Sequence, residues 1–149
     1  MTNNNIKLKK HIESILNGNN LTNALDFATF LDANEMSFAE SAVSYKNEVI
    51  CYMHLDENNE EPGPWTIWSE GDYSNEITNN LTKNIAWSHI NYCGSCGGDC
   101  SPGKLQTIFG KEFNSVCNAV MVFYIPNAET LECVKELLII RKNSIDNPD

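Results

Sequence analysis

Residues 119–125 read AVMVFYI, an unbroken apolar run. A strand with one solvated face alternates apolar and polar side chains, so an unbroken run indicates a strand in the middle of a sheet, covered on both faces. Pro126 ends this strand, and the Asn127 side chain can cap a following helix. The helix is predicted to turn five apolar side chains towards the core: Leu131, Val134, Leu137, Leu138 and Ile140.

Similar patterns upstream predict the remaining elements. Apolar residues at helical spacing predict helices over residues 6–16, 21–33 and 75–92. Ser74 is the expected N-cap of the third helix. β-Rich segments predict strands over residues 36–45, 48–55, 65–68 and 104–109. A turn at Lys46-Asn47 is expected to join the first two of these strands. The order predicts an α+β fold, with a mainly antiparallel sheet, packed helices and a Cys/Gly-rich metal loop.

Length and composition predict a single domain. The chain has 149 residues, of which 42% are hydrophobic, enough for one packed core. We expect the domain to span residues 1–149, with frayed tails at 1–5 and 144–149. No apolar stretch approaches the ~20 residues of a membrane span, and the N-terminus is polar, so we expect a cytoplasmic protein. An abundance of Asn, Ile and Lys hints at AT-rich bacterial coding.

The charge balance argues against polyanionic partners. Twenty acidic residues face ten basic ones, which gives a formal net charge of -10. Binding to nucleic acids or anionic membranes needs clustered Lys and Arg side chains. The densest basic run, Lys7, Lys9 and Lys10, is too short for this purpose. We therefore expect no nucleic-acid partner and no membrane partner.

The cysteines carry the clearest chemical pattern. Cys93, Cys96 and Cys100 fall in one glycine-rich segment, and Cys117 follows sixteen residues later. A Cys-x-x-Cys-Gly turn brings two thiolates to one ion, because glycine tolerates the left-handed backbone that the turn needs. Four thiolates close a tetrahedral zinc site and leave no position for a catalytic water. We therefore predict structural zinc bound by Cys93, Cys96, Cys100 and Cys117.

Three other interpretations of the cysteines remain open. The same thiolates could hold an iron-sulfur cluster, Cys93 and Cys96 could form a redox dithiol, or the thiols could stay reduced without metal. His89 lies four residues before Cys93, and on a helix this spacing would let it hydrogen-bond a ligand as an outer-shell residue. Cys51 and Cys133, on a predicted strand and a predicted helix, are interpreted as core packing.

The aromatic segment around residues 64–73 predicts a binding site. On a strand, Trp65 and Trp68 point to opposite faces, so one of them is available for a pocket or a surface. With Glu70 nearby and Tyr52 on the adjacent strand, aromatic rings beside a carboxylate could bind a small cationic or planar ligand. Ordinary core packing of both tryptophans is the alternative. The candidate ligand-binding residues are Trp65, Trp68, Glu70 and Tyr52.

The sequence contains no familiar catalytic motif. We therefore predict a zinc-stabilised, non-enzymatic module that binds a small molecule or a protein. The alternative is a thiol redox enzyme or sensor that uses Cys93 and Cys96. Homo-oligomer formation stays open on the sequence alone.

Overall fold

The apolar run at residues 119–125 forms most of the second half of β7 (Lys111–Tyr124). The computed structural model describes residues 3–56, 63–74, 79–92 and 103–148. Met121 of β7 pairs with residues of both β4 (Trp65–Ser69) and β5 (Ile90–Tyr92), so these two strands flank β7 on opposite edges. The central position predicted for this run is confirmed.

The described residues form one antiparallel sheet of seven strands. Its order is β1-β2-β3-β4-β7-β5, and β6 also pairs with β7. The remaining strands are β1 (Ser37–Ala39), β2 (Ala42–Tyr45), β3 (Glu48–Leu55) and β6 (Lys104–Ile108). Every strand pairing is antiparallel, which confirms the α+β class and the antiparallel sheet.

Two-residue turns close three hairpins of this sheet, those of β1–β2, β2–β3 and β6–β7. Glu40-Ser41, Lys46-Asn47 and Phe109-Gly110 all have positive φ at both positions. This is the geometry of type I′ turns, whose twist matches that of the strands they join. The turn at Lys46-Asn47 was predicted. The turn at Glu40-Ser41 was not, and it divides the single strand expected over residues 36–45 into β1 and β2.

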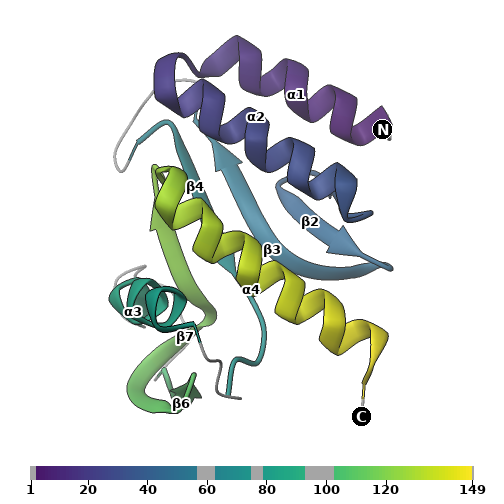
Figure 1. Cartoon of the computed structure of the whole chain (residues 1–149). Helices are drawn as coiled ribbons and strands as arrows, with labels where there is room; N and C mark the ends of the chain where they lie inside the picture. Colours follow the sequence, from purple (N-terminus) through teal and green to yellow (C-terminus); the bar gives the residue numbers. More distant parts are fainter. Residues whose placement is uncertain (1–2, 57–62, 75–78, 93–102, 149) are drawn as a thin grey trace.

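The four helices of the described residues are α1 (Asn3–Ile15), α2 (Gly18–Ala33), α3 (Asn80–Ser88) and α4 (Ala128–Asp146). α1, α2 and α4 lie over the same face of the sheet (Figure 1). α4 contacts α2, α3 and β3. The predicted cap is confirmed, because Asn127 Oδ1 accepts a hydrogen bond from the Thr130 N–H at 2.8 Å. Within the described residues, no helix has both the length and the apolar character needed to cross a membrane.

The core lies between these helices and the sheet. Of the five α4 side chains predicted to face inward, Leu131, Val134, Leu137 and Leu138 are buried, and Ile140 packs against the core in part. The sheet contributes fully buried side chains that include Met53, Trp65, Ile67, Met121 and Phe123. Burying one large apolar side chain stabilises a fold by about 1.5–3 kcal/mol, so this layer holds the helices in place.

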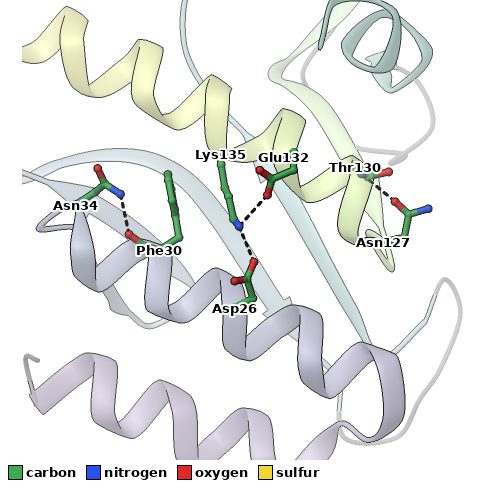
Figure 2. A network of polar contacts seen from close by, with 7 residues as sticks. All are labelled: Asp26, Phe30, Asn34, Asn127, Thr130, Glu132 and Lys135. Carbon is green, nitrogen blue, oxygen red and sulfur yellow. Dashed lines mark hydrogen bonds and ion pairs between the residues drawn. The ribbon is translucent and has the colours of Figure 1, made fainter. Parts of the chain in front are cut away.

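A polar contact links α2 to α4 at the edge of this core. Lys135 Nζ lies 2.5 Å from Asp26 Oδ2 on α2 and 2.9 Å from Glu132 Oε2 on its own helix (Figure 2). The same ammonium group lies over the Phe30 ring, 5.8 Å from its centroid. The aliphatic stem of a lysine can cover apolar surface while its charge stays near water. Lys135 of α4 therefore contacts both a carboxylate and an aromatic ring of α2 and links the two helices.

The third helix is shorter than the sequence pattern indicated. A helix was predicted over residues 75–92 with Ser74 as its cap, but α3 begins at Asn80 and ends at Ser88. The cap is Asn79, whose Oδ1 accepts hydrogen bonds from the N–H groups of Leu81 and Thr82. Residues 90–92 instead form β5, because pairing with β7 satisfies their backbone groups.

The connections and ends also differ from expectation. The second helix was predicted over residues 21–33, yet α2 begins at Gly18, with φ at +59°. Tails at 1–5 and 144–149 were expected to fray, but the structure places residues 3–5 in α1 and residues 144–146 in α4. Tertiary contacts hold both ends. Asn5 is fully buried, and Asp146 accepts hydrogen bonds from Tyr45 and Lys46.

We expect Asn5→Ala to destabilise the protein by about 1–3 kcal/mol. The Asn5 side-chain amide donates to Met36 O at 3.0 Å and accepts from the Phe38 N–H at 3.2 Å, and it thereby satisfies the outer edge of β1. Urea unfolding measures the change. Asn3→Ala, an exposed position on the same helix, is the matched control. Equal stability of the two variants would contradict this role of Asn5.

We expect the contribution of Asp146 to stability to disappear in acid. Hydrogen bonds from Lys46 and Tyr45 lower the pKa of Asp146 in the folded protein. A lowered folded pKa gives stability that is present above the unfolded pKa of about 3.9 and is lost as the pH falls through the folded pKa. Asp146→Asn should therefore lower the melting temperature at about pH 7 and make little difference at about pH 2.5. Glu112→Gln, an exposed carboxylate, is the control.

Candidate functional site

The predicted metal ligands are only partly within the described residues. Cys93, Cys96 and Cys100 lie outside them. Cys117 lies on β7 and is half-buried. Across residues 3–56, 63–74, 79–92 and 103–148, no three His, Cys, Asp or Glu side chains are grouped in a way that could hold a metal ion.

The chain on both sides of residues 93–102 returns to β7 beside Cys117. Tyr92, at the end of β5, pairs with Val116. Lys104, at the start of β6, pairs with the same Val116. A strand residue can have one paired neighbour on each edge, so β5 and β6 flank β7 at this point. Tyr92 and Lys104, which lie on either side of the cysteine-rich segment in the sequence, are therefore each one strand spacing from Val116, the neighbour of Cys117.

His89 does not lie on a helix that continues towards Cys93. It is the C-cap residue of α3, and the next residues are extended in β5. Its Nδ1 lies 2.7 Å from the carbonyl oxygen of Ile85 and 3.1 Å from Ser88 Oγ. Its ring packs against Phe123 at a centroid distance of 4.8 Å. The helical spacing that suggested an outer-shell role for His89 is therefore absent.

The two tryptophans of β4 point to opposite faces of the sheet. Trp65 is fully buried on the face that the helices cover, and its Nε1 donates to Asn20 Oδ1 at 3.4 Å. Trp68 is half-buried and lies on the other face. The opposed orientation predicted from the strand pattern is confirmed. Because Trp65 belongs to the core, it does not lie with the other predicted ligand-binding residues.

The face of the sheet opposite the helices carries two rows of paired side chains across β3, β4 and β7. One row is Tyr52, Trp68 and Val122, and the other is His54, Thr66 and Tyr124. Directly paired residues, and residues two apart on a strand, project from the same face. We call the four ring-bearing residues, Tyr52, His54, Trp68 and Tyr124, the aromatic face.

The aromatic face has an acidic neighbour. The Glu70 carboxylate raises the pKa of Tyr52, chiefly because a phenolate beside it would be repelled, with smaller contributions from burial and from their hydrogen bond. The His54 and Trp68 rings lie 6.4 Å apart between centroids and are tilted by 54°. Three of the predicted ligand-binding residues, Tyr52, Trp68 and Glu70, are thus brought together.

Two members of the aromatic face were missed by the sequence analysis. His54 is exposed, and Tyr124 keeps 52% of its surface exposed. His54 could have been found from the period of two along β3, which puts it on the same side as Tyr52. Tyr124 gave no such signal, because its apolar run looked buried on both faces and its partner strand was not known.

The two cysteines interpreted as core residues are buried. Cys51 is fully buried on β3, and Cys133 on α4 is 2% exposed, with its Sγ 3.7 Å from the carbonyl oxygen of Thr82. Burial raises the pKa of Cys133 to about 12 and also raises that of Cys51. Both thiols therefore stay protonated near neutral pH and are poor nucleophiles.

Comparisons with known proteins add no homologue to this picture. No protein-family model, no curated protein and no solved structure matches the chain.

Proposed function

We propose that this protein is a zinc-stabilised, non-enzymatic module that binds a small cationic or planar molecule on its aromatic face. The observation that carries the proposal is the pair of rows across β3, β4 and β7, which gathers Tyr52, His54, Trp68 and Tyr124 on one face. The residues come from three strands. No short sequence motif contains them, so the fold itself assembles the surface.

Apolar rings on this face favour a ligand. The solvated face of an antiparallel sheet ordinarily carries polar side chains. Here a half-buried tryptophan adjoins tyrosine and histidine rings, and Tyr124 is half exposed. Aromatic rings supply large contact areas, and Tyr and Trp also offer a polar atom for a hydrogen bond. A flat ligand laid across the rings would remove this apolar surface from water.

Electrostatics favours a ligand with positive charge. Glu70 adjoins Tyr52, and the whole chain carries a formal net charge of -10. Elsewhere, lysines lie over the rings of Tyr45, Trp87, Phe113 and Phe30. Among the described residues no lysine lies over a ring of the aromatic face in this way. A cation over an aromatic ring is worth about 0.5–2 kcal/mol, so these rings offer an external cation a favourable position.

The positions of Tyr92 and Lys104 support the zinc part of the proposal. Both pair with Val116, the neighbour of Cys117. Consecutive Cα atoms are 3.8 Å apart and paired Cα atoms at most about 5.5 Å apart, so the Cα atom of Tyr92, the residue that precedes Cys93 in the sequence, lies within about 10 Å of that of Cys117. Chain connectivity therefore allows a shared metal ion. Four thiolates would make that ion structural and would tie β5, β6 and β7 together.

We expect benzyltrimethylammonium, a cation with a planar ring, to bind the aromatic face. In an NMR titration its largest shift changes should fall on β3, β4 and the end of β7. Trp68→Ala should weaken binding at least tenfold, about 1.4 kcal/mol, and Glu70→Gln about two- to fivefold.

The matched control for these variants is Leu105→Ala, which removes an exposed apolar side chain from β6. It should bind the probe as the wild type does. A neutral ligand of the same shape, neopentylbenzene, should bind more weakly. Equal binding of the probe by Trp68→Ala and the wild type, with both folded, would refute the aromatic face as the binding site.

We expect protein purified under reducing conditions to carry one zinc ion per chain, and chelation to lower its melting temperature. Cys117→Ser should weaken zinc binding by more than about 100-fold, because it removes a ligand rather than an outer-shell contact. Cys133→Ala, the control, should lower stability and keep the metal.

Thiol titration separates this proposal from its alternatives. Metal-held cysteines should react with a thiol reagent only after a chelator is added. Free, reactive thiols that form a reversible disulfide would instead support the redox interpretation of Cys93 and Cys96, and bound iron with sulfide would indicate a cluster. Protein without any metal would eliminate the zinc part of the proposal.

A further inference from the structure

A groove lies between α1 and β1, away from the aromatic face. It has a volume of about 380 Å³ and is lined on the α1 side by Asn4, Lys7, Leu8 and His11. The β1 side supplies Phe38 and Ala39, and Glu40 of the following turn completes the wall. Small-molecule sites typically have volumes of about 300–1,000 Å³, so the groove is large enough for one small ligand.

The walls of the groove are held at a fixed separation. Asn5, which adjoins Asn4 on α1, is fully buried and spans the gap to β1. Its amide nitrogen donates to Met36 O, and its amide oxygen accepts from the Phe38 N–H. A site formed before binding does not have to be ordered by its ligand, which favours affinity. Asn5 therefore acts as a spacer for the groove.

The same contact argues against a peptide strand as the occupant. An added strand would pair with the free edge of β1, where Phe38 N–H and Met36 O point outward. Asn5 already binds both groups. The groove therefore lies beside an edge strand whose outward Phe38 N–H and Met36 O are already satisfied. This is the arrangement expected for a small molecule.

The charges of the groove select the kind of molecule. Lys7 and His11 are one helical turn apart, so both project from the α1 wall. Lys7 belongs to the densest basic run of a chain whose net charge is -10, and His11 directly follows that run. Phe38 and Ala39 supply apolar surface, Leu8 is almost wholly buried in the wall, and Glu40 is the one acidic group among the lining residues.

We propose that this groove binds a small molecule with an anionic head and a flat or branched apolar body. The head pairs with Lys7 and His11, and the body lies against Leu8, Phe38 and Ala39. Glu40 disfavours a second negative charge in the groove, so the site selects a single anionic head. The proposal is independent of the aromatic face, which is expected to take a cation.

The probe for the test is 2-naphthoate, a carboxylate on a planar apolar body, and 2-naphthylmethanol is its neutral counterpart. Titration of the full chain followed by NMR should show the largest amide shift changes in α1 and β1, and tighter binding of the carboxylate. Lys7→Gln should weaken naphthoate binding about two- to fivefold, the effect of one exposed charge pair. Glu40→Gln should strengthen it by a similar factor.

Lys10→Gln provides the matched control, because it removes the same charge from the same helix at a residue that does not line the groove. It should leave naphthoate binding close to that of the wild type. Ala39→Phe, which adds a ring to the groove wall at an exposed position, should abolish binding while the protein stays folded.

Three results would overturn the proposal. The first is shift changes that map outside α1 and β1. The second is an equal loss of affinity in Lys7→Gln and Lys10→Gln, which would indicate attraction by the helix as a whole. The third is equal affinity for the neutral alcohol and the carboxylate, which would leave an apolar groove without the selectivity for an anion.

Discussion

The fold depends on the pairing of β7 along both of its edges. A buried strand must satisfy its backbone N–H and C=O groups on each side, and β7 does so with β4, β5 and β6. Met121 lies between β4 and β5, and Val116 lies between Tyr92 and Lys104. These pairings bring together segments that are far apart in the sequence. They also place Tyr92 and Lys104, on either side of the cysteine-rich segment, next to the neighbour of Cys117.

The packing of α1, α2 and α4 on one face of the sheet determines what the other face can do (Figure 1). The apolar side chains of these helices are buried against one set of alternating strand residues, which includes Met53, Trp65 and Ile67. The alternate set of strand residues, which includes Tyr52 and Trp68, projects from the opposite face of the sheet. Side chains alternate between the two faces along each strand, so the residues that form the core and the candidate binding residues lie on opposite faces.

Polar side chains complete the fold where backbone pairing ends. Asn5 takes the place of a neighbouring strand at the outer edge of β1, and Asn127 and Asn79 cap α4 and α3. Asp146 ties the last turn of α4 to the β2–β3 turn through Tyr45 and Lys46. The contacts of the three asparagines satisfy backbone groups that an edge or a helix end would leave unpaired. The Asn5 contact also sets the distance between α1 and β1, and the groove lies between these two elements.

Local patterns in the sequence determined the elements whose signals are short-range. The apolar run before Pro126, the cap at Asn127, the turn at Lys46-Asn47 and the opposed directions of Trp65 and Trp68 all depend on periods of a few residues. The tertiary structure alone decided which strands meet. The polar first half of β7, the short β5, the buried amide of Asn5 and the position of Tyr124 beside Thr66 depend on partners distant in the sequence. No local period records such a partner, because its position is set by the packing of the whole chain.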